Sequence, residues 1–474
     1  MTSIGTRPDR DGEHLILGAT VRTLGAWPAG WRYPGAHSDP AADGDALRRL
    51  ALAAESAKFD FLFFGDWLAT APGYEFTDPY LLARIEPFAA AGYLAAITDH
   101  IGLVVTANTV HSEPYTVART TASLDLLSRG RIGLNLATGA EPRSASNFGS
   151  DVVPSAEDRL AAAAEFVDLV RALWDSWQDG AVLADVDSGH FIDDALIVPT
   201  NYAGRFHSST GPLNVLRPPQ GHPPVMLAGS STGARQLSAL FADLSLVSPP
   251  TLDDAIVAYA DAKARAAASG RENADQRLLT PILPVVAETR EEAWEIYDRL
   301  VNLVQGDDVR GNAPRGLPSN RSMRALAGAL GVPLTGVQLD EAVPRRVGAR
   351  FSELGKRLAA IVKARSGRTI AGERPISYRH LLVAHSVVAP VIVGSADDIA
   401  THLETWFRRS AVDGFTVLAP YLHEQFEAFT TLVVPELVSR GLFRADYDGS
   451  TLRDHLALPV PGNVHQLAPS LSYQ

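Results

Sequence analysis

The sequence predicts an α/β fold, namely a (β/α)8 TIM barrel with insertions. Short apolar runs of strand length alternate with longer helical patterns, and about eight such units can be counted. This alternation implies right-handed crossovers and a mainly parallel sheet that is buried on both faces. Eight units favour a closed barrel over an open sheet. The length of 474 residues exceeds that of most single cores, so a second domain stays open as the alternative.

The first strand–helix unit and the second strand are expected near the N-terminus. His14–Ala19 is a short apolar run, and Asp45–Ala57 is an Ala- and Leu-rich helical segment after a loop rich in proline and glycine. Phe61–Asp66 is a continuous apolar run that ends in a carboxylate. Because this run is too short for a helix, we interpret it as a buried strand.

The next two units follow the same alternation. Pro87–Thr98 has helical periodicity and precedes the apolar strand Ile101–Ala107. Tyr115–Leu127 is the next predicted helix and ends just before a glycine, as helices commonly do. Arg131–Thr138 is then the next predicted strand.

The remaining elements of the barrel lie further along the chain. Ala161–Trp177 is an amphipathic helix, Pro224–Ala228 is a strand and Ser231–Ala242 is a helix. The last unit is the strand Gly414–Ala419 with the helix Glu424–Leu442.

Two stretches do not fit the alternation. Residues 179–223 are rich in Gly, Pro, Asp and His, and residues 305–385 are polar and helical with repeated Pro and Arg. We interpret both as insertions on one barrel domain that spans residues 1–474, the second insertion being helical.

Composition excludes several classes of function. Apolar residues make up 46% and charged residues 20% of the chain, as in globular domains. The net charge of −12 argues against a surface for nucleic acid or an anionic membrane. We find no apolar stretch near the ~20 residues of a membrane helix, no signal peptide and no cysteine. We therefore expect a cytoplasmic protein without thiol or iron–sulfur chemistry.

Polar residues follow several of the predicted strands, at the barrel face where active sites lie. They are Asp66, Thr106, Asn108, Asn135, Thr138 and the run Gly229-Ser230-Ser231. Asp66 ends an apolar strand, where a carboxylate needs a partner, so a helix N-cap or an internal ion pair is an equally good explanation for it. The thirteen histidines form no metal-binding signature, and we expect no metal site.

The segment Gly229–Gly233 between a strand and a helix has three interpretations. As Gly-x-Ser-x-Gly it would be a nucleophile elbow with Ser231 as the nucleophile of a serine hydrolase. As a turn that opens a helix it would present N–H groups and hydroxyls to a phosphate. As a plain N-cap its serine would only stabilise the helix.

With these residues in view, the sequence resembles a known family. It is similar to the nitrilotriacetate/EDTA/dibenzothiophene-sulfone monooxygenase branch of the bacterial-luciferase-like flavin-dependent monooxygenases. The matching stretches are residues 59–66, 101–109, 113–119, 122–131, 147–149, 173–177, 211–214, 219–221, 228–231, 413–415, 434–437 and 441–443.

The resemblance implies a flavin enzyme with two components. The family members are luciferase-like barrels, usually homodimers or homotetramers, that take reduced FMN from a separate NAD(P)H:flavin reductase and use O2 to oxygenate a small organic substrate. Carried over by position, the residues implied to bind the cofactor are Asp66, Thr106, Asn108, Gly229, Ser230 and Ser231. Asn135 corresponds to a pocket asparagine and is the candidate catalytic residue. The resemblance favours the phosphate-binding interpretation of Gly229–Gly233.

The chain departs from the family pattern at two cofactor positions. Ala156 and Leu160 stand where relatives have a His and a Tyr that help hold the flavin phosphate and ribityl chain. Losing two hydrogen bonds of about 0.5–1.5 kcal/mol each would weaken FMN binding roughly 5- to 150-fold. That loss is tolerable for a diffusing co-substrate, especially if Arg159 or Arg143 reaches the phosphate.

Two further departures bear on the substrate. Gly25-Ala26-Trp27 replaces Gly-His-His, and Ala137-Thr138-Gly139 replaces Val-Thr-Ser. Ala26, Trp27 and Gly139 suggest a roomier, more apolar pocket and hence a neutral or aromatic substrate. Several arginines converging on the pocket would argue against that expectation. The rival functions are an F420-dependent oxidoreductase of the same superfamily and a non-catalytic barrel paralogue.

Overall fold

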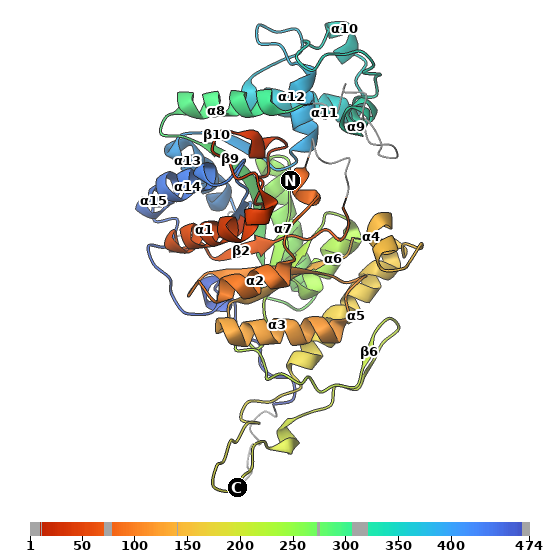
Figure 1. Cartoon of the computed structure of the whole chain (residues 1–474), viewed down its shortest axis with the longest axis vertical. Coiled ribbons are helices and arrows are strands. Elements are labelled where there is room, and N and C mark those ends of the chain that lie inside the picture. The colour runs from red at the N-terminus through yellow and green to blue at the C-terminus, as the bar shows by residue number, and fades with distance from the viewer. Residues whose placement is uncertain are drawn as a thin grey trace.

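The computed structural model describes residue 10 and residues 12–70, 78–139, 141–272, 275–305 and 321–466. Its central feature is a closed barrel of parallel strands (Figure 1). Around the barrel the strands are β1 (Ile16–Thr20), β2 (Phe61–Phe64), β3 (Gly102–Asn108), β4 (Ile132–Ala137), β7 (Val225–Ala228), β8 (Leu244–Leu246), β9 (Arg277–Val286) and β11 (Gly414–Val417). The pairing of β11 with β1 and of β8 with β9 closes the ring. The predicted (β/α)8 barrel is thus confirmed.

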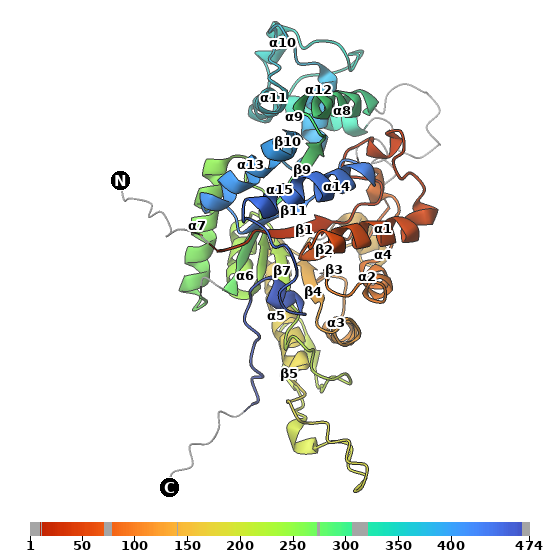
Figure 2. The ribbon, with the colours of Figure 1, turned by 90° about the vertical axis from the view of Figure 1, so that its left-hand side faces the viewer.

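The outer layer of the barrel is helical, and Figure 2 shows these helices around the strands. They are α1 (Asp43–Ser56), α2 (Pro87–Ala95), α3 (Pro114–Ser128), α5 (Ala156–Trp174), α6 (Thr232–Phe241), α7 (Leu252–Ala268), α8 (Arg290–Leu303), α13 (Ala396–Arg408), α14 (Glu424–Ala428) and α15 (Val434–Ser439). Helix α5 begins five residues before the predicted start, because the Ser155 side chain accepts a hydrogen bond from Asp158 N and caps it. Strand β2 ends at Phe64, so Asp66 lies in the following loop.

The two irregular stretches extend from the barrel toward opposite ends of the molecule's longest axis (Figures 1 and 2). Residues 179–223 form an arm with the short hairpin β5 (Tyr202–Ala203) and β6 (Ser208–Ser209). Within 305–385, residues 306–320 lie outside the described residues, and the rest carries α9 (Arg321–Leu330), α10 (Arg345–Gly348), α11 (Glu353–Ser366) and most of α12 (Tyr378–Ser386). These helices enclose a hydrophobic cluster of their own with α8. Strand β10 (Val391–Gly394) follows them and pairs with the second half of β9.

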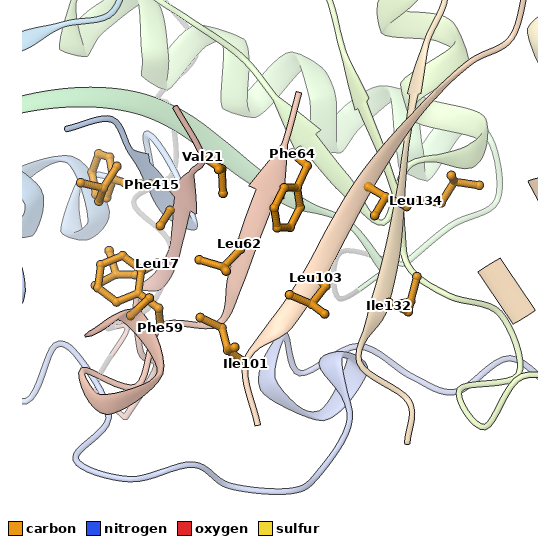
Figure 3. Close-up of a cluster of buried hydrophobic side chains, with 14 of the residues drawn as sticks. Leu17, Val21, Phe59, Leu62, Phe64, Ile101, Leu103, Ile132, Leu134 and Phe415 are labelled. Atoms are coloured by element: carbon orange, nitrogen blue, oxygen red, sulfur yellow. The ribbon is translucent and has the colours of Figure 1, made fainter. Parts of the chain in front are cut away.

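Two apolar layers hold the barrel together. Figure 3 shows the outer one, in which Leu17, Leu62 and Leu103 point from consecutive strands toward the helices. Their neighbours Ile16, Phe61 and Val104 fill the barrel interior. This alternation follows from the period of two along a strand.

The N-terminal end of the barrel is closed by α16 (Leu452–His455). Leu452 packs so closely that a Cβ atom on Gly102 would lie 2.5 Å from its Cδ1 atom, and one on Gly133 would lie 3.1 Å from its Cδ2 atom. Leu452 thus packs closely against the N-terminal ends of β3 and β4. Active sites in such barrels lie at the opposite, C-terminal ends of the strands.

Several residues of the family-like stretches stabilise the closed end. The buried Gln220 donates from Nε2 to Asp125 Oδ1 (2.7 Å) and to Ile132 O (2.8 Å), and its Oε1 accepts from Arg453 N. The buried Asp413 accepts hydrogen bonds from three elements, as discussed below. Part of the resemblance therefore reflects the packing of the barrel rather than its chemistry.

Three half-buried or buried histidines make the stability of the fold depend on pH. Burial lowers the pKa of His402, of His380 and of His455 to about 4. The unfolded chain takes up these protons near pH 6.5. The histidines' contribution to stability is therefore complete above pH 6.5 and is lost as the pH falls toward 4.

We expect His402→Phe to make the free energy of unfolding depend less on pH. His402 stacks on Trp406 with ring centroids 5.4 Å apart, and its buried Nε2 has no hydrogen-bond partner, so phenylalanine preserves the packing and removes the titration. Urea unfolding at pH 7.5 and pH 5 measures the effect as a smaller loss of stability in the variant than in the wild type. Equal losses in both proteins would contradict the assignment.

Candidate active site at the carboxyl ends of the barrel strands

Thr106 and Asn135 form a buried polar pair inside the barrel. They are register partners on β3 and β4. Each lies two residues after the partners Val104 and Gly133, closer to the C-terminal ends of the strands. Thr106 Oγ1 donates to Phe64 O (2.6 Å) and therefore accepts from Asn135 Nδ2 (2.9 Å). This order fixes the orientation of the amide, since its NH2 group must face Thr106. Asn135 Oδ1, in a residue only 6% exposed, has no hydrogen-bond partner, which suits it to accept from an N–H group of a ligand.

The turn Gly229-Ser230-Ser231 connects β7 to α6. Gly229 has φ +140°, and a Cβ atom there would lie 2.8 Å from Ala234 Cβ, so glycine is required. Ser231 Oγ accepts from Ala234 N (3.2 Å) and caps the helix, while both serines are exposed. Capping is thus confirmed for Ser231. Within the described part of the chain no histidine or carboxylate bonds to Ser231, so a nucleophile elbow has no base here. The free helix start remains suited to an anion.

Of the two positions that depart from the family pattern, position 160 lies beside the first turn of α6. Ala156 is the exposed first residue of α5. Leu160 packs against α6, because a Cβ atom on Gly233 would overlap Leu160 Cδ1. Position 160 therefore adjoins the first turn of α6 but offers only methyl groups there. Arg159 donates from Nε to Thr138 O (3.1 Å) and from Nη1 to Pro154 O (2.5 Å), which commits most of its guanidinium to the backbone.

Asp66 and Asn108 lie at the same end of the barrel but differ in what they can offer a ligand. Asp66 is half-buried, and its Oδ1 accepts from Trp67 N (2.7 Å); it forms no ion pair with any described residue. Asn108 donates from Nδ2 to Gly139 O (2.9 Å) and accepts from Val110 N (2.9 Å). Its polar atoms thus hold the loops after β3 and β4 in place, and Asn108 is better suited to positioning the site than to binding within it.

A cluster that the sequence did not reveal lies at the ends of β1 and β2. Arg22 forms an ion pair with Asp78, and the guanidinium carbons of Arg22 and Arg84 lie 5.0 and 5.4 Å from the ring centre of Tyr80. Arg22 follows the first strand directly, but the predicted strand ended at Ala19, and residues 78–84 belong to a loop with no periodicity. No sequence pattern indicated that the two arginines meet.

Trp27, one of the three residues behind the expected apolar pocket, does not line a pocket. Trp27 is only 1% exposed, donates from Nε1 to Leu300 O (2.9 Å) and belongs to the cluster under the helical insertion. It is therefore part of the core rather than of a pocket wall.

A closed parallel barrel with polar side chains at the carboxyl ends of its strands defines a TIM-barrel enzyme. Residues 28–414 match the family model for luciferase-like monooxygenase. The chain belongs to this family, and its class is that of the oxygen-inserting oxidoreductases.

Two relatives and one solved structure are similar along almost the whole chain. The chain is 37% identical over 462 residues to nitrilotriacetate monooxygenase component A of Aminobacter aminovorans, covering 95% of this chain and 98% of the relative. It is 35% identical over 452 residues to N-acetyl-S-(2-succino)cysteine monooxygenase of Bacillus subtilis, at 95% and 98% coverage. The EDTA monooxygenase structure from Chelativorans superposes with a TM-score of 0.74 and 28% identity, covering 94% and 99%. The resemblance inferred from the sequence is confirmed.

Two absences apply to the residues that the structure describes. None of their helices combines the length and apolar character needed to cross a membrane. No three or more of their His, Asp or Glu side chains converge as metal ligands would.

Proposed function

We propose that this protein is the oxygenase component of a two-component monooxygenase that uses reduced FMN and O2. The observation that carries the proposal is the fixed Asn135 amide, whose Oδ1 is unpaired and which lies toward the C-terminal end of β4, at the end of the barrel that also carries the Gly229–Ser231 turn. Asn135 Oδ1 can accept from an N–H group of an isoalloxazine ring, and the Gly229–Ser231 turn can bind the phosphate of the same cofactor. The family membership and the "component A" of the Aminobacter relative support it.

Reduced FMN, when bound, supplies the two electrons with which one O2 yields one oxygen atom for the substrate and one water. The chain contributes position and shielding. Thr106, which fixes the Asn135 amide, would hold that amide toward the flavin ring, the start of α6 would bind the phosphate, and Asp66 would contact the cofactor from the loop after β2. Helix α16 packs against the N-terminal end of the barrel and would keep water from entering the site at that end.

The substitutions at positions 156 and 160 fit a flavin that enters and leaves in each cycle. A separate NAD(P)H:flavin reductase would deliver it, and the chain would act as a homodimer or homotetramer in the cytoplasm. Leu160 packs on the first turn of α6 without adding a hydrogen bond, so phosphate binding rests on the backbone and the two serines.

We expect Leu160→Tyr to strengthen the binding of FMN. A phenol at this position adds one hydrogen bond at the phosphate turn, worth about 0.5–1.5 kcal/mol or roughly 2- to 12-fold in Kd. Fluorescence titration with FMN and with riboflavin, which lacks the phosphate, measures the effect. The gain should be confined to FMN, and an equal gain for riboflavin would show that position 160 is not beside the phosphate.

Anaerobic titration with reduced FMN and with reduced F420 tests the proposed cofactor. The proposal expects saturable binding of reduced FMN and a weaker or absent response to F420. Binding of F420 alone would favour the F420-dependent oxidoreductase, and binding of neither would favour a non-catalytic paralogue.

A further inference from the structure

Arg22 and Arg84 both contact the ring of Tyr80 at the open end of the barrel. Arg22 is the second residue after β1, and Val21 N donates to Phe63 O (2.9 Å), which ties this segment to the end of β2. Arg84 Nη2 donates to Trp67 O (3.2 Å), next to Asp66. Figure 3 shows Val21 and Phe64 close together at the same ends of their strands. Both arginines are thus anchored at the carboxyl ends of β1 and β2.

The ring of Tyr80 joins the two guanidinium groups. It contacts both of them, and its residue is only 6% exposed. Burial raises the pKa of Tyr80 to about 12, so the phenol is neutral and supplies no counter-charge. The ring thus holds both guanidinium groups by cation–π contact, and the neutral phenol does not neutralise them.

The cluster has more N–H donors than acceptors. Asp78 pairs with Arg22, yet Arg22 Nε is buried without a partner, and so is Trp67 Nε1. Arg84 has a backbone carbonyl as its partner and forms no ion pair with any described residue. Buried donors of this kind are normally satisfied, and an arginine fork matches the geometry of a carboxylate.

The flavin phosphate is not the anion that fits here. In the ring of strands, β1 and β2 are separated from β7 by β3 and β4 on one side and by β11, β9 and β8 on the other. The Gly229–Ser231 turn after β7 therefore lies across the barrel from the arginines. If the phosphate of the cofactor occupies that turn, the phosphate does not reach Arg22 and Arg84, and these arginines can bind the substrate.

We propose that Arg22 and Arg84 bind a carboxylate group of the substrate, which makes the substrate a small organic acid. That the bound acid is oxygenated rests on the proposed function. That the two arginines bind a carboxylate does not. We prefer this inference to the expectation of a neutral or aromatic substrate, which loses the support of Trp27 because that side chain lies in the core. Arg84 makes the more specific contribution, since it has no carboxylate partner within the described residues.

Isothermal titration calorimetry with succinate, nitrilotriacetate and the neutral succinamide tests the site, with and without reduced FMN under anaerobic conditions. We expect saturable binding of at least one of the two acids and none of succinamide. Arg84→Met and Arg22→Lys should weaken acid binding about tenfold or more, because each loses a charge-assisted fork. Arg48→Met, an exposed arginine on α1, should leave it unchanged.

The flavin titration on the same variants separates the two proposals. Arg84→Met should bind reduced FMN with an unchanged Kd. If neither acid binds up to roughly 10 mM, if succinamide binds equally well, or if Arg84→Met binds the acid as the wild type does, the inference is wrong. If the acids bind as expected but reduced FMN does not, the carboxylate site stands and the proposed function fails.

Discussion

Asp413→Ala will lower the free energy of unfolding by about 3–5 kcal/mol. The carboxylate is only 6% exposed and accepts from Arg10 Nη2 (3.1 Å), the Tyr259 hydroxyl (2.8 Å) and Leu278 N (2.8 Å). Lys263 Nζ lies 3.5 Å away. Burial alone would raise the pKa of Asp413, but Lys263 and Arg10 hold it below its usual value. Removing the carboxylate takes away the buried counter-charge that Arg10 and Lys263 share.

Urea unfolding at pH 7.5 measures this loss, and Asp397→Ala is the matched control. Asp397 also pairs with an arginine, Arg440, but its side chain is 78% exposed. An exposed pair of this kind contributes about 1 kcal/mol or less. If Asp413→Ala lowered the free energy of unfolding no more than Asp397→Ala does, the buried network around Asp413 would not be what joins the starts of β9 and β11.

Asn135→Leu will weaken the binding of reduced FMN about 5- to 150-fold while the fold stays intact. Leucine removes the acceptor Oδ1 and leaves the buried N–H group of the bound ring without a partner, at a cost of about 1–3 kcal/mol. Thr106→Val should give part of this effect, because it frees the Asn135 amide to rotate. Thr106→Ser keeps the hydroxyl that anchors Asn135 and should bind as the wild type does.

Anaerobic titration of the three variants, with circular dichroism as a check of the fold, measures these effects. We expect the largest rise in Kd for Asn135→Leu, a smaller rise for Thr106→Val and none for Thr106→Ser. This ranking is specific to an amide that is oriented by its threonine. Equal Kd values in all three would mean that the pair only fills the barrel interior.

The alternation of apolar runs with helical patterns was enough to predict the barrel. Where the prediction missed a boundary, the reason is local. Residues 156–160 lack apolar periodicity, and α5 starts there because Ser155 caps it. The role of Trp27 could not be predicted, because it packs on Leu300, which is 273 residues away in the sequence.

The candidate site was predictable only as a set of strand ends. Thr106 and Asn135 were each placed at the open face, but their hydrogen bond depends on the register between β3 and β4, which no local pattern encodes. The same holds for Arg22 and Arg84, which meet because a loop returns over Tyr80. Asn108 fits a strand-end pattern as well as Asn135 does, and only its bonds to Gly139 and Val110 show that it holds the loops.

The most direct test of the proposed function is rapid mixing of the protein, loaded anaerobically with reduced FMN, with O2. We predict that flavin oxidation follows a time course different from that of free reduced FMN, and that Asn135→Leu returns it toward the free rate at equal flavin concentration. Oxidation of the wild-type mixture that cannot be distinguished from free flavin, at protein concentrations that saturate binding, would contradict a flavin-dependent monooxygenase.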